Sequence, residues 1–177
     1  LTHLPAGRPQ RIADACTGSG CIAITLAAER PLVQVSATDI SSDALAVARR
    51  NAVEHGVHTR VGFSKGDLLA RLEGPFDLIT CNPPYVASGD APSLQPEVGR
   101  YEPHLALFAG ADGLDIIRRL LPEAATRLAS GGQLLVEFGF GQSEAIRQLI
   151  SDTGGLTMVA IRDDLQGIPR VLVARRS

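Results

Sequence analysis

Short apolar runs alternate with helical segments along nearly the whole chain of 177 residues. This alternation is typical of an α/β domain in which helices cover a mostly parallel sheet. The last two apolar runs follow one another closely and are expected to form an antiparallel pair. The expected strands are Arg11–Ala15, Gln34–Asp39, Val61–Ser64, Phe76–Cys81, Gln133–Phe138, Leu156–Ile161 and Arg170–Ala174.

Helices are expected between these strands, where apolar residues recur at a helical spacing. Ser41 or Ser42 can cap the second helix, Gly56 is suited to end it, and Pro122 is expected to kink the third. The stretch of about 29 residues from Tyr85 to Gly113 is predicted to be a long loop, a length that favours a binding role. The expected helices are Cys21–Ala28, a segment that carries Leu45, Ala48 and Ala52, then Leu114–Leu128 and Ser143–Thr153.

The composition, 45% apolar and 20% charged, is that of a globular protein, and the net charge of -2 offers no basic surplus for phosphate contacts. Cys16, Cys21, Cys81 and four scattered histidines show no metal-binding spacing, so no metal is expected. Free thiols indicate a reducing compartment, and no membrane span or signal peptide is visible, which predicts a cytoplasmic location. Because the sequence begins at Leu1 and not at Met, it is expected to be a fragment.

A glycine-rich loop separates the first strand from the first helix. Its glycines permit a sharp turn and a close approach to a ligand, and the helix start offers free N–H donors. Asp39, at the end of the second strand, can accept both hydroxyls of an adenosine ribose, or it can simply cap the next helix. The same loop also satisfies a dinucleotide-binding fingerprint, so by itself it leaves NAD, S-adenosylmethionine or a purely structural turn open. The loop residues are Cys16, Thr17, Gly18, Ser19 and Gly20.

The turn Asn82-Pro83-Pro84-Tyr85 follows the fourth strand, at the edge where ligands bind in open α/β sheets. Its two prolines lack N–H donors, so their carbonyls are available as acceptors. A planar NH2 group fits the turn, with its hydrogens on the Asn82 side chain and the Pro83 carbonyl and its flat face against Tyr85. Such a grip aims the nitrogen lone pair at a methyl electrophile, which favours S-adenosylmethionine over NAD. The alternative is a structural turn.

Taken together, these motifs resemble a class I methyltransferase that acts on nitrogen. Residues 82–121 more narrowly resemble the PrmC/HemK family of protein-(glutamine-N5) methyltransferases, which modify peptide chain release factors. The closer resemblance is carried by Arg100–Pro103, by the turn from Ala109 to Gly113, and by Glu137–Gln142.

The resemblance implies a Rossmann-like class I fold over residues 1–177, with S-adenosyl-L-methionine as methyl donor and S-adenosyl-L-homocysteine as product. The implied acceptor is the side-chain amide of glutamine in the Gly-Gly-Gln loop of a release factor, which would be the protein partner of a monomeric enzyme. No membrane or direct nucleic-acid contact is expected. The implied roles are residues 16–20 around the methionine and sulfonium, Asp39 on the ribose, Asp67 and Leu68 beside the adenine, Asn82, Pro83, Pro84 and Tyr85 as the catalytic turn, and Asn82 also next to the cofactor.

Two departures from the family pattern stand out. Many class I enzymes have Gly where Cys16 stands, and Cys16 is expected to keep a negative φ. The family's N-terminal helical domain and the segment that joins it to the catalytic domain are expected to be absent from this chain. In addition, Asp67 has an alternative role as a loop-capping residue.

Three other functions remain as alternatives. A nucleic-acid amino methyltransferase acting on adenine N6 or guanine N2 would use the same turn on a flipped base, but the acidic balance and the lack of a target-reading domain argue against it. An NAD-dependent dehydrogenase would need a catalytic acid or base, and no histidine stands out. A non-catalytic cofactor-binding domain would not need an intact Asn82–Tyr85 turn.

Overall fold

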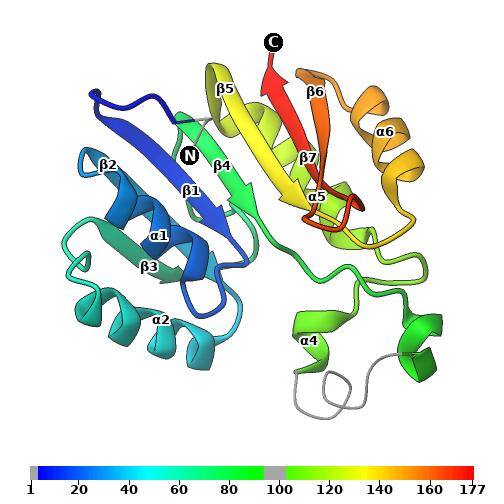
Figure 1. The fold of residues 1–177 in the computed structure, drawn as a ribbon, viewed down its shortest axis with the longest axis horizontal. Helices are drawn as coiled ribbons and strands as arrows, with labels where there is room; N and C mark the ends of the chain where they lie inside the picture. Colours follow the sequence, from blue (N-terminus) through cyan, green and yellow to red (C-terminus); the bar gives the residue numbers. More distant parts are fainter. Residues whose placement is uncertain (1–3, 94–102) are drawn as a thin grey trace.

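The computed structural model describes residues 4–93 and 103–177, which form one seven-stranded sheet in the order β3-β2-β1-β4-β5-β7-β6 (Figure 1). All neighbouring strands are parallel except that β7 is antiparallel to both β5 and β6. The expected α/β architecture, the mostly parallel sheet and the antiparallel final pair are therefore confirmed. The strands are β1 (Gln10–Ala15), β2 (Val33–Asp39), β3 (Val61–Lys65), β4 (Phe76–Cys81), β5 (Leu128–Glu137), β6 (Leu156–Asp163) and β7 (Pro169–Arg176).

Four of the helices cover the two faces of the sheet. Helices α1 (Cys21–Glu29) and α2 (Ser42–Glu54) pack with one face, and α5 (Asp115–Arg127) and α6 (Ser143–Asp152) pack with the other. Because side chains alternate along a strand, Ile12 belongs to the first core and the next residue, Ala13, to the second. Strand β1 is thus fixed from both sides.

Local signals explain where several elements begin and end. Ser41 caps α2 by accepting a hydrogen bond from the Ala44 N–H at 3.2 Å, and Gly56 follows the helix with a φ of 67°. Helix α5 contains Pro122, as expected from the sequence. Strand β5, in contrast, begins five residues earlier than predicted, at Leu128. Its start is irregular, because the register with β4 shifts there and Gly131 has a φ of 73°.

The prediction of one long loop from Tyr85 to Gly113 is wrong in its described parts. That stretch contains a 3-10 helix at Ser88–Ser93 and the short helix α4 at His104–Leu107. Its two ends are joined by backbone hydrogen bonds. The Val86 N–H donates to the Leu107 carbonyl at 2.8 Å, and the Ala109 N–H donates to the Val86 carbonyl at 3.0 Å. These bonds satisfy polar groups that an open loop would leave to water. Of the Arg100–Pro103 motif, all but Pro103 lies outside the described residues.

Candidate functional site

The sequence motifs meet at one edge of the sheet because parallel strands end there together. Ala15, the last residue of β1, is paired with Thr38 of β2 and with Cys81 of β4. Neighbouring strands lie about 5 Å apart, so the residues that follow this row are close neighbours. Those residues are Cys16, Asp39 and Asn82.

The glycine loop is closely packed at Gly20 and open at Gly18. Gly20 has a φ of 85°, and a Cβ on it would lie 2.9 Å from Cδ1 of Ile24, so only glycine fits there. Gly18 has a φ of 56°, and a Cβ on it would meet no atom within 4 Å. The space over Gly18 is therefore free for a ligand to lie against the backbone. The loop is held from below by a hydrogen bond from the Thr17 N–H to the Thr38 carbonyl at 3.0 Å.

The expectation that Cys16 keeps a negative φ is wrong, because its φ is 55°. The chain must reverse direction at once after β1, and this left-handed conformation achieves the turn at a cost of about 1–3 kcal/mol for a residue other than glycine. The Cys16 side chain packs against the core. Its hydrogen bond to Cys81, together with burial, raises the pKa of the Cys81 thiol well above its usual range, so Cys81 is a neutral, structural cysteine.

Asp39 contacts both the glycine loop and the start of α2. Its Oδ2 accepts the Gly18 N–H at 2.9 Å, and its Oδ1 accepts the Ser41 N–H at 2.8 Å. The cap of α2 itself is Ser41. A carboxylate offers about four acceptor positions, so each oxygen of Asp39 retains capacity for a further donor. Asp39 therefore lies directly beside the open surface over Gly18.

Gly66, Asp67 and their neighbours line a shallow pocket of about 430 Å³ beyond the ends of β2 and β3. The Asp67 side chain is 54% exposed and forms an ion pair with Arg119. Leu68 is different, because its side chain is only 3% exposed and belongs to the core. Its φ of 49° and the hydrogen bond that its carbonyl accepts from Thr38 at 2.7 Å fix the backbone that follows Asp67. Leu68 itself does not line the pocket, and it adjoins the pocket through Asp67.

The turn that follows β4 presents one exposed polar side chain and one anchored ring. Asn82 is exposed, whereas Pro83 is buried and Tyr85 is half-buried. The Tyr85 hydroxyl donates to Oε1 of Glu137 at 3.3 Å. Burial, and then the negative charge of Glu137, raise the pKa of Tyr85 above its usual value, so the hydroxyl remains a donor at neutral pH.

Asp14 is a buried carboxyl beneath these motifs, with 1% of its surface exposed. It accepts hydrogen bonds from the hydroxyls of Thr17 and Thr80, each at 2.6 Å. Burial raises its pKa from 3.8 to about 6, and the two hydroxyls oppose that rise. Asp14 therefore connects the glycine loop with β4.

Residues 1–95 match the family model of the methyltransferase small domain. The matched stretch carries the glycine loop, Asp39, Asp67 and the Asn82–Tyr85 turn. The chain belongs to the methyltransferase small domain family. The motifs in the matched stretch are thus those that the structure brings to a single edge.

Several relatives of this methyltransferase domain are named release factor glutamine methyltransferase. That of Rhodospirillum rubrum is 47% identical over 94% of this chain and 51% of its own length. That of Bradyrhizobium diazoefficiens is 46% identical over 97% of this chain and 58% of its own length. The resemblance to the glutamine methyltransferase family is confirmed, and the chain spans little more than half of these relatives.

Among solved structures, TrmN from Thermus thermophilus aligns with a TM-score of 0.70 and 22% identity, over 97% of this chain and 45% of that one. At this identity the likeness concerns the fold alone, and the expected Rossmann-like class I methyltransferase fold is confirmed. In the described ranges of the domain, no cluster of His, Cys, Asp or Glu suited to a metal ion is found. Within the same ranges, no helix is long and apolar enough to span a bilayer.

Sequence reasoning gave no role to three residues of this methyltransferase site. Asp14 had one available signal, a carboxyl among the apolar residues Ile12, Ala13 and Ala15 of the first strand. Glu137 and Gln142 were noted only as part of the resemblance, because their contacts with Tyr85 depend on β5 lying beside β4, which the sequence order of motifs does not reveal.

Proposed function

We propose that this chain is the catalytic domain of an S-adenosylmethionine-dependent enzyme that methylates the side-chain amide nitrogen of glutamine. The proposed acceptor is the Gly-Gly-Gln loop of a peptide chain release factor. The observation that carries the proposal is the adjacency of the Asn82 turn and the glycine loop at the ends of paired strands. The names of the relatives at 46–47% identity support the choice of acceptor.

The residues present fit the methyl donor. The open surface over Gly18 suits the methionine and sulfonium portion, with Cys16, Thr17, Ser19 and Gly20 completing the loop. Asp39 would accept the ribose hydroxyls, and the pocket beside Asp67 and the Leu68 backbone would receive the adenine. When bound, S-adenosylmethionine supplies a methyl group on a positively charged sulfur.

The residues of the turn would bind and orient the acceptor amide. The side-chain carbonyl of Asn82 and the backbone carbonyl of Pro83 would each accept one N–H, and the Tyr85 ring would pack on the flat amide. An amide nitrogen is a weak nucleophile because its lone pair is delocalised. Fixing both hydrogens directs the lone pair at the methyl group, which lowers the orientational part of the barrier. After transfer the nitrogen is cationic and acidic, so one proton leaves to water and no general base is needed beforehand.

The remaining expectations are part of the same proposal. The enzyme acts as a monomer on a protein partner and makes no direct nucleic-acid contact. Since release factors act on ribosomes, the reaction is placed in the cytoplasm. The rival acceptor is an exocyclic amino group of a flipped base, which would fit the same turn.

The test is methyl transfer from labelled S-adenosylmethionine to a purified release factor, followed by peptide mapping, with the full-length protein as enzyme. We expect the label on the Gly-Gly-Gln glutamine and none on a release factor in which that glutamine is replaced by alanine. Label on nucleic acid in place of protein would refute the acceptor. Calorimetric titration with S-adenosylhomocysteine and with NAD tests the cofactor separately, and tight binding of NAD alone would refute the whole proposal.

A further inference from the structure

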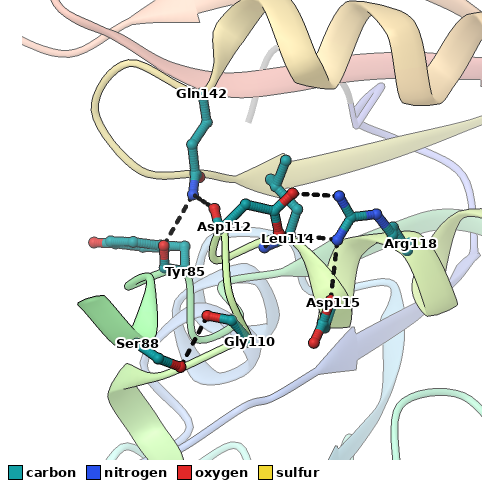
Figure 2. Close-up of polar contacts among 8 residues, drawn as sticks. All are labelled: Tyr85, Ser88, Gly110, Asp112, Leu114, Asp115, Arg118 and Gln142. Atoms are coloured by element: carbon teal, nitrogen blue, oxygen red, sulfur yellow. Dashed lines mark hydrogen bonds and ion pairs between the residues drawn. The ribbon is translucent and has the colours of Figure 1, made fainter. Parts of the chain in front are cut away.

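Gln142 connects three segments of the chain through a single side-chain amide, and Figure 2 shows its two bonds to Tyr85 and Asp112. Its Oε1 accepts the Gly139 N–H at 2.7 Å, at the end of β5. Its Nε2 donates to the carbonyl of Tyr85 and to the carbonyl of Asp112, both at 3.0 Å. An amide nitrogen has two hydrogens, so these two bonds use the full donor capacity of the Gln142 side chain.

The junction of Tyr85, Asp112, Gly139 and Gln142 is packed so closely that Gly113 is required and a side chain at Gly139 would have little room. A Cβ on Gly113 would lie 2.2 Å from the Tyr85 carbonyl oxygen and 2.6 Å from Nε2 of Gln142. A Cβ on Gly139 would lie 3.0 Å from Oε1 of Gln142 and 3.2 Å from Cδ2 of Tyr85. These glycines belong to the 109–113 and 137–142 segments, for which the proposed function alone gives no role.

The Asp112 side of the junction is held by its own contacts (Figure 2). Oδ1 of Asp112 accepts the Leu114 N–H at 3.1 Å and a hydrogen bond from Arg118 at 2.9 Å. The Arg118 guanidinium lowers the pKa of Asp112 to about 2, so the carboxylate stays charged at neutral pH. The Asp112 carbonyl is therefore a fixed acceptor at the start of α5, and Gln142 joins Tyr85 to it.

The turn after β4 needs hydrogen bonds from other segments of the chain to hold it in place. Pro83 and Pro84 have no N–H, so this part of the backbone cannot donate to a neighbouring strand or close a helical turn. Beyond the prolines, Tyr85 forms two hydrogen bonds with other segments. Its carbonyl accepts one from Gln142, and its hydroxyl donates one to Glu137. Glu137 is the last residue of β5, and Gln142 lies between β5 and α6. The end of β5 and the segment after it therefore determine where the Tyr85 ring lies.

We propose that Gln142 is a positioning residue that holds Tyr85, and with it the turn from Asn82, in the geometry needed for methyl transfer. The inference rests on the proposed function and adds the device that orients its acceptor site. Gln142 contacts none of the residues assigned to the methyl donor. Its loss should therefore lower the rate of transfer and leave binding of the donor unchanged.

The kinetic test compares Gln142→Met and Gln142→Glu with Gln148→Ala in the full-length protein. Methionine keeps the length without the hydrogen bonds, and glutamate keeps the acceptor for Gly139 but loses both donors. Gln148 is the matched control, because it lies on α6, the helix that follows Gln142, and its amide donates to Asp152 at 2.9 Å on the surface. We expect kcat to fall about 10- to 100-fold in both Gln142 variants, with the Kd for S-adenosylhomocysteine within about twofold, and no change in the control. A wild-type kcat in Gln142→Glu would overturn the proposal.

A second readout does not depend on the reaction. The two tyrosines of this chain are Tyr85 and Tyr101, so the difference in phenolate absorbance between the full-length protein and the same protein carrying Tyr85→Phe reports Tyr85. We expect Tyr85 to ionise at lower pH in Gln142→Met than with Gln142 intact, since a released ring moves into water and away from Glu137. An unchanged titration in a folded variant would overturn the positioning role. If the wild-type enzyme transfers no methyl group to a release factor, the proposed function fails, while this titration still decides whether Gln142 holds Tyr85.

Discussion

The hydroxyl of Tyr85 donates to Glu137 across 3.3 Å, which joins the turn after β4 to the end of the neighbouring strand β5. A hydrogen bond of this length contributes about 1 kcal/mol or less, whereas the ring supplies the flat face on which the amide packs. We expect Tyr85→Phe to keep its transfer rate within about tenfold of wild type. Tyr85→Ala should lose roughly a further tenfold or more, because the ring is removed as well. Equal rates in the two variants, measured by single-turnover transfer, would contradict a role for the ring.

Asn82 is exposed and is assigned a hydrogen bond to the acceptor amide. Asn82→Ala should therefore fold normally and bind S-adenosylhomocysteine within a few-fold of wild type. Its transfer rate should fall by at least ~100-fold, the usual effect of removing one preorganised polar partner at a reacting group. Single-turnover transfer to a release factor measures this, and a wild-type rate would leave the turn with a structural role only.

Asn82→Asp separates charge from hydrogen bonding at the same position. The variant keeps an acceptor of equal size but places a negative charge beside the sulfonium. That charge would stabilise the cationic donor in the ground state more than in the charge-dispersed transition state, so the rate should still drop. The same assay checks it, with cofactor affinity measured in parallel. A rate at or above wild type would mean that Asn82 is not close to the reacting methyl group.

Asp39→Ala should weaken cofactor binding at least about tenfold, because a charge-assisted hydrogen bond is worth about 1.5–3 kcal/mol. The variant also leaves the N–H groups of Gly18 and Ser41 without their acceptor, so a modest loss of stability should accompany it. Asp43→Ala is a suitable control, since Asp43 is exposed in the first turn of α2. Calorimetry with S-adenosylhomocysteine decides, and an unchanged dissociation constant in Asp39→Ala would reduce Asp39 to an organiser of the loop.

Asp14 should make stability fall as the pH rises. Its folded-state pKa is raised from 3.8 to about 6, so between these values the folded chain binds more protons than the unfolded chain. The corresponding loss of unfolding free energy is about 3 kcal/mol. It is complete above the folded-state pKa of about 6 and absent below the unfolded-state value of 3.8. Urea unfolding of the wild type and of Asp14→Asn at several pH values isolates this effect from other groups. A difference between the two proteins that does not vary with pH would show that Asp14 is not titrating in this range.

Elements with strong local signals could be predicted from the sequence. Strand β4 has its predicted bounds, Phe76–Cys81, because Pro75 precedes the apolar run and Pro83 follows it closely. The first residues of β5 were missed because Gly131 and Gly132 disfavour a strand, and the pairing of Leu128 with Phe76 of β4 is a tertiary effect. Helix α4 was missed because four residues are too short to show a helical period.

The site was predictable to the extent that it depends on strand ends. Residues that follow parallel strands meet at one edge whatever the order of the strands, so the neighbourhood of Asp39 and Asn82 could be anticipated. The support of Tyr85 by Gln142 could not, since it requires β5 to lie beside β4 and the 109–113 turn to bring the Asp112 carbonyl to Gln142. The positive φ of Cys16 was also beyond reach, because no local signal favours that conformation in cysteine.

Strand β7, the last of the seven along the chain, lies between β5 and β6. On the ribosome, β5 and β6 therefore emerge before the strand that joins them. Until residues 169–176 arrive, β5 has unpaired backbone groups along one edge and β6 lacks its partner strand. The half of the sheet that carries the glycine loop does not depend on a later strand, because β1 to β4 pair among themselves. Newly made chains should thus acquire the donor half of the site first, and secure the segment that holds Tyr85 only when synthesis has passed β7.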